Sequence, residues 1–262
     1  MEDIQNSADS RGIAIQHVGV REVHLPFQIK TKEGDFQQIL ARIQFMVSLS
    51  EKYKGTHMSR FLEILHRWSS RPVAEPEMEA MLDEALDRLS ADSANMEIRF
   101  KYFIKKTAPV SGRESFLDLD CCFYGSKRRD GRFVFSLGVE VPAASLCPCS
   151  KSISRYGAHN QRGIMRAHVR FCEGFDCIYI EDLAALMESQ ASSPVYSLLK
   201  REDEKYVTEH AYETPKFVED ILRDLVLALR NLPHIEWFSV SCENFESIHN
   251  HNAYASHEEQ VA

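Results

Sequence analysis

Two cysteines and a histidine lie close together in the segment SLCPCSKSISRYGAHN, residues 145–160. Pro148 alone separates Cys147 from Cys149, and His159 follows ten residues after the second thiol. Thiolate and imidazole groups are ligands for zinc and similar divalent metals. Two cysteines one residue apart are too close for both to bind one metal comfortably, which leaves the second thiol available for catalysis. The spacing favours a catalytic metal site, and a buried polar loop with a hydrogen-bonded histidine is the alternative.

A second cluster occupies ENFESIHNH, residues 243–251, just after a predicted strand. It combines Glu243, Glu246, His249 and His251 within nine positions. Functional residues are often placed on loops at strand ends. A solvated acidic loop would have a similar composition. The presence of two ligand-rich clusters in one chain favours a site.

Charged side chains dominate a third segment, residues 200–220, where spacing alone singles out no carboxylate. Glu219 and Arg223 have the i,i+4 spacing of a helical ion pair, which explains both without any function. Three other side chains are plausible phosphate contacts, although solvated lysines are the default interpretation: His57, Lys105 and Lys106.

Apolar patterns predict the elements that hold these clusters. Alternation typical of strands covers residues 43–49, 96–102, 117–123, 133–141, 165–171 and 235–242. Helical spacing covers residues 61–68, 78–89, 181–191 and 214–229, the last with Thr214 as cap and Pro215 in its first turn. Strands followed by paired helices, twice over, predict an α+β fold with antiparallel sheets and helices on one face. The other face of such a sheet needs cover, which oligomerisation usually provides.

The predicted organisation is two tandem modules, residues 12–110 and 111–254, of which the second carries both ligand-rich clusters. Residues 1–11 and 255–262 show no such pattern, and we expect the first to be disordered and the second to be a flexible tail.

Composition argues against several classes of function. The 262 residues are 44% apolar and 27% charged, as in an ordinary globular protein. A net charge of −8 argues against sequence-independent binding to nucleic acid, although a few local cations suffice for a small anionic substrate. No apolar run reaches about 18 residues, so no membrane span is expected. The seven cysteines, together with a polar N-terminus that lacks a secretory pattern, favour a reducing cytoplasm.

Seven short motifs follow one another along the chain: GTHMSRF, KKTAPVSG, SLCPCSK, YGAHNQR, DEKYVTE, PKFVED and ENFESIHNH. With these motifs the chain resembles the prokaryotic GTP cyclohydrolases of type IB, from about Ile15 to Tyr254. The resemblance implies the tunnelling fold and a homotetramer. It also implies the conversion of GTP and water into 7,8-dihydroneopterin triphosphate and formate, the entry step to folate and to queuosine-type tRNA modification.

The resemblance implies a divalent metal held by Cys147, His159 and Glu204. The metal would be zinc, manganese or iron, since the family tolerates several. By the same likeness, water activated at the metal attacks C8 of the guanine. One departure concerns the third ligand, because Glu202 stands where relatives often have proline and places three carboxylates in a row. We expect Glu204 to be the ligand.

The remaining site residues also follow from the resemblance. Cys149 matches the essential thiol that is not a metal ligand. Glu219 matches the glutamate that holds N1–H and the amino group of guanine. Glu243, His57 and Lys105 are expected to bind substrate. Catalysis is assigned to Glu246, His249 and His251, with His249 also a candidate ligand and the two imidazoles as proton carriers.

Three rivals keep the same fold. One is the archaeal-type variant that yields a cyclic-phosphate pterin, and another is the nitrile reductase, which needs NADPH and has a different motif. The third is a metal-binding protein that has lost turnover, which the intact thiol, histidine and glutamate positions argue against.

Overall fold

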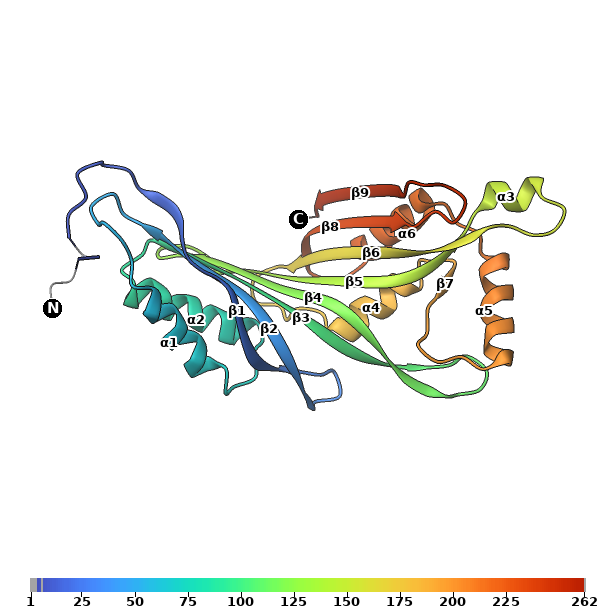
Figure 1. The fold of residues 1–262 in the computed structure, drawn as a ribbon, viewed down its shortest axis with the longest axis horizontal. Helices are drawn as coiled ribbons and strands as arrows, with labels where there is room; N and C mark the ends of the chain where they lie inside the picture. The colour runs from blue at the N-terminus through green and yellow to red at the C-terminus, as the bar shows by residue number, and fades with distance from the viewer. Residues whose placement is uncertain (1–3, 6, 262) are drawn as a thin grey trace. The chain divides into compact units, whose positions relative to one another are not determined.

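The computed structural model describes residues 4–5 and 7–261 and is an α+β protein (Figure 1). Its strands are β1 (Ile15–Lys30), β2 (Phe36–Leu49), β3 (Ser93–Thr107), β4 (Glu114–Arg128), β5 (Val134–Leu146), β6 (Asn160–Phe171), β7 (Ser193–Pro194), β8 (Ile235–Asn244) and β9 (Ala253–Gln260). Its helices are α1 (Met58–Trp68), α2 (Glu75–Arg88), α3 (Pro148–Ile153), α4 (Ile180–Glu188), α5 (Arg201–Glu213) and α6 (Val218–Arg230). The strands pair in the order β1-β2-β3-β4-β5-β6-β8-β9, with β7 on β5. The predicted fold class is confirmed.

The chain divides into two compact units that are not consecutive in sequence. One contains Met1–Lys101 and Cys122–Ser136, and the other contains Tyr102–Cys121 and Leu137–Ala262. Strands β3, β4 and β5 each contribute a segment to both units. The module boundary at residue 110 stays a prediction.

The first unit packs helices α1 and α2 against strands, and its apolar patterns explain why. Ile43, Phe45, Met96 and Ile98 are buried on β2 and β3, at the alternate positions that a strand turns to one face. Helix α1 buries Phe61, whose ring meets Phe45 edge-on at a centroid distance of 5.3 Å. Helix α2 buries Met78, Met81, Leu82, Ala85 and Leu86, as the helical spacing predicted.

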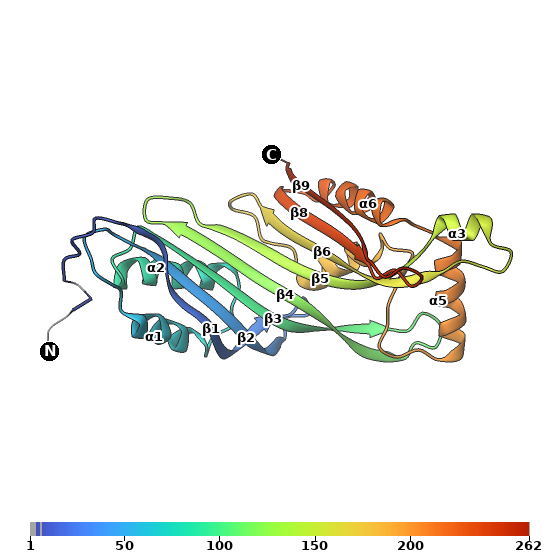
Figure 2. The same ribbon diagram turned by 45° about the horizontal axis from the view of Figure 1, so that its top comes forward.

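The second unit is built around β5, β6, β8 and β9, with α4 and α6 buried on their apolar sides. Ile221, Leu225 and Leu229 are buried along one stripe of α6, which lies along β8 (Figures 1 and 2). The buried residues of β8 are Ile235, Phe238, Val240, Cys242 and Asn244. This unit contains nearly all of the predicted site residues.

The prediction of a flexible tail at residues 255–262 was wrong, because β9 pairs with β8 from Asn244↔Ala253 to Trp237↔Gln260. Its side chains are mostly polar and outward-facing, so no apolar alternation marks the strand. The Trp237 indole donates to Glu258 at 3.0 Å. Ala262 lies outside the described residues.

At the other end of the chain, part of the predicted N-terminal disorder falls on residues 1–3 and 6, which lie outside the described residues. Ala8 forms an isolated bridge with Tyr53, and the Arg11 side chain donates to Asp9 at 2.9 Å. Strand β1 follows at Ile15, and the sequence patterns had not indicated it.

The predicted start of the last helix at Thr214 was also wrong. Thr214 is the C-cap of α5, and α6 begins at Val218 after Phe217. The Lys216 amide donates to the Leu146 carbonyl at 3.1 Å, which holds the connection between α5 and α6 against the end of β5. Helix α5 escaped prediction because it is charged and buries only Asp203 and Ala211.

None of the helices among the described residues has both the length and the apolar composition required of a membrane-crossing segment.

Candidate active site

Strand pairing brings the two ligand-rich clusters to one end of the sheet in the second unit. Leu146, at the end of β5, pairs with Asn160, at the start of β6. Asn244, at the end of β8, pairs with Gly163. The loops at residues 147–159 and 245–252 therefore leave the same sheet end.

Gly163 permits the close approach of β8 to β6 at this point. A Cβ atom on residue 163 would lie 2.6 Å from the Asn244 Oδ1 and 2.7 Å from the Glu243 carbonyl oxygen. Both distances are shorter than van der Waals contact allows, so a side chain at this position would push the strand ends apart.

Cys147 caps the short helix α3, which is entered at Pro148. The Ser150 amide donates to the Cys147 sulfur at 3.5 Å, and the Cys147 amide donates to the His159 carbonyl at 3.1 Å. The Ser150 hydroxyl donates to the Cys147 carbonyl and accepts from the His159 amide. Ser150 thus ties the backbones of the thiol and the imidazole together.

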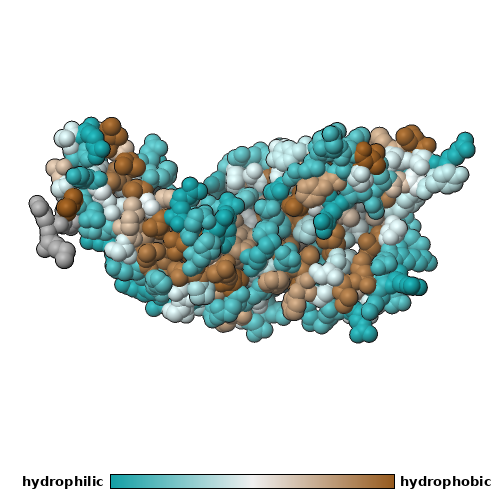
Figure 3. All heavy atoms as spheres, viewed as in Figure 1, coloured by the Kyte–Doolittle hydropathy of each residue, from teal (hydrophilic) through white to brown (hydrophobic). Residues whose placement is uncertain are grey.

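We call the segment at residues 147–159 the tip. Cys149 lies on its exposed side. The turn back to β6 uses Gly157 at a φ of 125°, which side-chain-bearing residues rarely adopt. Ile153 and Tyr156 are 84% and 97% exposed, and Figure 3 shows hydrophobic atoms among hydrophilic ones near α3. The tip therefore presents one thiol and two large apolar side chains to solvent.

The His159 ring contacts a buried polar pair. Its Nδ1 lies 3.0 Å from the Gln161 Oε1, and the Gln161 Nε2 donates to the Ser145 hydroxyl at 2.8 Å. Sequence reasoning missed Gln161 and Ser145. Both lie just outside the predicted strands at 133–141 and 165–171, and the available signal was that each continues the alternate, core-facing positions of the neighbouring strand pattern.

Glu243 lies at the end of β8, just before the loop at residues 245–252, and its carboxylate is fully hydrogen-bonded. Glu243 accepts from Arg166 at 3.1 Å and from Asn252 at 2.9 Å, and these hydrogen bonds, Asn252 first, lower the pKa of Glu243. Arg166 also pairs with Glu140 at 3.1 Å. Both Glu243 oxygens are thereby occupied, which suits a positioning role better than substrate contact.

Beyond Glu243 the loop exposes its imidazoles. The rings of His249 and His251 stack at a centroid distance of 5.1 Å with an interplanar angle of 22°. Both are exposed, and Glu246 is half-buried. The structure brings these three residues to the sheet end that carries Cys147 and His159.

Helix α5 starts with a fully buried carboxylate that sequence reasoning did not assign. Asp203 accepts from the amides of Val110, Ser111 and Lys200 at 2.8–2.9 Å and from the Ser111 hydroxyl at 2.6 Å. Burial alone would raise the pKa of Asp203, but the hydrogen bonds from Ser111, Lys200 and Val110 lower it overall. Asp203 thus fastens the turn after β3 to α5 and has no oxygen left for a metal.

Glu204 is exposed in the first turn of α5, next to Asp203. The opposite end of α5 adjoins the tip, because the Lys151 ammonium of α3 donates to the Tyr212 carbonyl and lies 4.2 Å from its ring centroid (Figure 1). At 1.5 Å per residue, Glu204 lies about 12 Å along the helix from Tyr212. The structure therefore does not bring Glu204 to Cys147 and His159 within one chain.

Glu219 occupies the first turn of α6, three residues after the Lys216 amide that bonds to the end of β5. Its carboxylate is exposed. The ion pair expected from spacing is not formed, because Arg223 pairs with Asp220 at 3.4 Å instead. Glu219 is thus near the sheet end that carries the two loops and is not engaged by Arg223.

Within residues 4–5 and 7–261, no three side chains of His, Cys, Asp or Glu are grouped so that they would hold a metal ion. Cys147 and His159 are adjacent through their backbones. A thiolate, an imidazole and a carboxylate are nevertheless a suitable donor set for zinc or ferrous iron, and the carboxylate also admits manganese. The fit of the first two residues is supported by the Gln161 oxygen at the His159 Nδ1, which leaves Nε2 available to a metal.

The predicted phosphate contacts have different surroundings. Lys105 forms an exposed ion pair with Glu114 at 2.7 Å. Lys106 pairs with Glu188 at 2.5 Å, and both side chains are about nine-tenths buried, beside the Tyr196 ring. Burial raises the pKa of Glu188, against the opposing effect of Lys106. Lys106 therefore serves the core of this unit.

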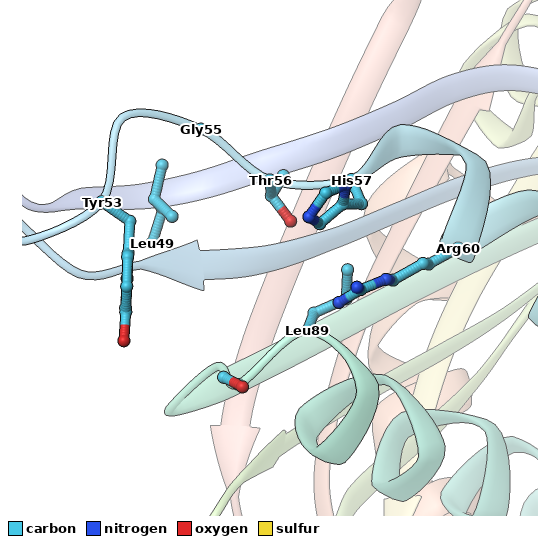
Figure 4. Close-up of a pocket in the computed structure, with 8 residues that line it drawn as sticks. Leu49, Tyr53, Gly55, Thr56, His57, Arg60 and Leu89 are labelled. Atoms are coloured by element: carbon cyan, nitrogen blue, oxygen red, sulfur yellow. The ribbon is translucent and has the colours of Figure 1, made fainter. Parts of the chain in front are cut away.

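His57 belongs to the first unit, where it precedes α1 and lines a pocket of about 300 Å³ with Thr56 and Arg60. Figure 4 shows the His57 ring and the Thr56 hydroxyl beside each other and the Arg60 side chain across from them. The Arg60 guanidinium also donates to the Arg88 carbonyl at 2.6 Å. The pocket combines an imidazole, a hydroxyl and a guanidinium, which are suitable partners for an anion.

Comparison with known families decides the relationship of this chain. The model of the type I GTP cyclohydrolases, folE2, matches residues 1–255. The chain belongs to this family. The GTP cyclohydrolase FolE2 of Geotalea uraniireducens (strain Rf4) is 52% identical over 256 residues, which cover 98% of this chain and 92% of that protein. The GTP cyclohydrolase FolE2 of Geobacter sulfurreducens is 52% identical over 259 residues, covering 99% and 98%.

Solved structures show the fold. Urate oxidase from Bacillus subtilis 168 superposes with a TM-score of 0.51 at 10% identity, over 95% of this chain and 100% of that one. A hyperthermostable mutant of Bacillus sp. TB-90 urate oxidase gives a TM-score of 0.51 at 9% identity, over 94% and 99%. The expected tunnelling fold is confirmed.

Proposed function

We propose that this protein is a GTP cyclohydrolase that opens the imidazole ring of the guanine and yields 7,8-dihydroneopterin triphosphate and formate, the first step of folate-type pterin synthesis. The observation that carries the proposal is the match of nearly the whole chain to FolE2 proteins at about half identity. The loop that contains Cys147, Cys149 and His159 supplies side chains suited to this chemistry.

We propose Cys147, His159 and Glu204 as ligands of one divalent metal ion, either zinc, manganese or iron. Such an ion lowers the pKa of a water molecule toward neutrality and so provides a nucleophile for C8 of the purine. Of the three carboxylates in a row, Asp203 is excluded as a ligand by its four hydrogen bonds. Glu204 is preferred over Glu202 because of its match to the family motif.

A homotetramer would resolve the separation of Glu204 from the tip, since a second copy of the chain could bring its own Glu204 to Cys147 and His159. The exposed side chains of Ile153 and Tyr156 at the tip, and Phe116 on β4, support an assembly that covers them. We also place the protein in the cytoplasm, which is supported by the lack of any disulfide among the seven cysteines of the described residues.

The other residues bind the substrate and move protons. Glu219 would accept hydrogen bonds from N1–H and the amino group of guanine, a donor pair that adenine lacks. His249 or His251 would take a proton from the attacking water and deliver it to N9 as the C8–N9 bond breaks. Cys149 would donate or accept a proton at the reacting carbon's substituents during formation of the formamide and its hydrolysis to formate. Glu246 would orient an imidazole.

We assign contacts to the triphosphate to His57 and Lys105. Glu243 would contribute to substrate binding indirectly, through Arg166 and Asn252. The Lys105–Glu114 pair is exposed, so exchanging Glu114 for a phosphate costs little. For His57, the neighbouring Thr56 and Arg60 support an anion contact.

The test is GTP turnover by protein that has been stripped of metal and then supplied separately with zinc, manganese or iron. Formate release and the mass of 7,8-dihydroneopterin triphosphate are the expected result. A cyclic-phosphate product would indicate the archaeal-type reaction. Absence of formate with every metal would contradict the proposal.

A further inference from the structure

A glutamine and a serine occupy core positions beneath the active-site tip. On β6 the buried, inward-facing residues are Gln161, Gly163, Met165, Ala167 and Val169. On β5 the series Leu137, Val139, Val141, Ala143 ends at Ser145. Ser145 and Gln161 are opposite each other in the strand register and are 1% and 8% exposed. Two apolar core series thus end in a buried polar pair.

Burial of an amide and a hydroxyl is unfavourable unless their hydrogen bonds are made. The Gln161 Nε2 donates to the Ser145 Oγ at 2.8 Å, and in this orientation the oxygen end of the amide faces the tip. The Gln161 Oε1 then lies 3.0 Å from the Nδ1 of His159. Because an amide oxygen can only accept, this contact requires a proton on Nδ1.

We propose that Gln161, oriented by Ser145, is a positioning residue that holds His159 in its Nδ1–H tautomer and leaves the Nε2 lone pair for the metal. The inference rests on the proposed function for the identity of His159 as a ligand. Partners of this kind set the tautomer and the ring orientation of metal-binding histidines.

Ser150 provides a contrast within the same tip. Its hydroxyl bonds to the backbones of Cys147 and His159 and does not touch the ring. Loss of Ser150 should therefore loosen the loop without changing the tautomer, whereas loss of Gln161 should change the tautomer directly.

The experiment compares Gln161→Leu, Gln161→Glu and Ser150→Ala with the unchanged protein. Ring-nitrogen NMR on metal-free protein, above the imidazole pKa, reads the tautomer of His159, and competition with a zinc indicator reads metal affinity. In the unchanged protein we expect the Nδ1–H tautomer. In Gln161→Leu we expect gain of the other tautomer and about 10- to 100-fold weaker zinc binding. Gln161→Glu retains an acceptor and should retain the tautomer, as should Ser150→Ala.

An Nε2–H tautomer in the unchanged protein would overturn the inference. So would zinc affinity within twofold of normal in a folded Gln161→Leu protein. If that variant does not fold, Ser145→Ala provides the same test, because freeing the amide to rotate should mix the tautomers. A tautomer and zinc affinity that depend on Gln161, in a protein that releases no formate from GTP, would support this inference and contradict the proposed function.

Discussion

The polar side chains found at the two ends of helix α5 differ in whether their hydrogen bonds are made. At its start, every acceptor of Asp203 is engaged by Val110, Ser111 or Lys200. At its other end, next to the tip, Cys149 is exposed and makes no hydrogen bond or ion pair among the described residues. Groups whose bonds are already made stabilise the fold, and groups left without them remain available to a substrate or a metal. Four predictions test this division.

The largest effect is expected from Cys149→Ser. If the exposed thiol donates or accepts a proton in the reaction, kcat/KM for GTP should fall about 10²- to 10⁴-fold while metal content stays normal. Cys172→Ser, a half-buried thiol away from the tip, is the matched control and should keep its activity. Near-normal turnover of Cys149→Ser would remove this thiol from the mechanism.

Glu204→Ala should reduce metal affinity by about 100-fold or more, since the change removes a proposed ligand and even the supporting partners of metal ligands are worth about 10- to 100-fold. Glu202→Ala is the neighbouring control and should retain metal. Metal content is measured after dialysis of the purified protein. The reverse pattern would move the ligand to Glu202.

Asp203→Ala should mainly affect stability, because four donors lose their acceptor. We expect the thermal midpoint to fall by roughly 5 °C or more, with Glu202→Ala unchanged. Turnover should fall severalfold, as the start of the helix that carries Glu204 loosens. An unchanged midpoint would mean that the turn after β3 is held by other contacts.

The smallest effect concerns another fully engaged carboxylate, Glu259 on β9. Hydrogen bonds from Arg230 and His257 lower the pKa of Glu259 from 4.5 to about 2. A carboxyl group whose pKa is lower in the folded state stabilises the fold at pH values above its pKa in the unfolded chain. This stabilisation is lost as the pH falls from about 4.5 toward 2. Glu259→Gln should therefore flatten the dependence of the urea midpoint on pH in this window. Glu258→Gln, on the same strand, should leave that slope unchanged.

The sequence predicted the elements whose apolar residues repeat regularly, such as α2 and the core strands. It did not predict β9 or α5, because both face solvent along most of their length and their stability comes from partners distant in sequence. The thiol and histidine cluster was evident from spacing. Asp203 and Gln161 were not, because a polar residue acquires its role only when the fold buries it next to particular donors.

The absence of one methyl group at residue 163 determines how far apart the thiol loop and the imidazole loop stand. An alanine there would collide with the end of β8, so the separation of the two loops would widen even though no residue of either loop had changed. The spacing of these two loops therefore depends on a position with no chemistry of its own.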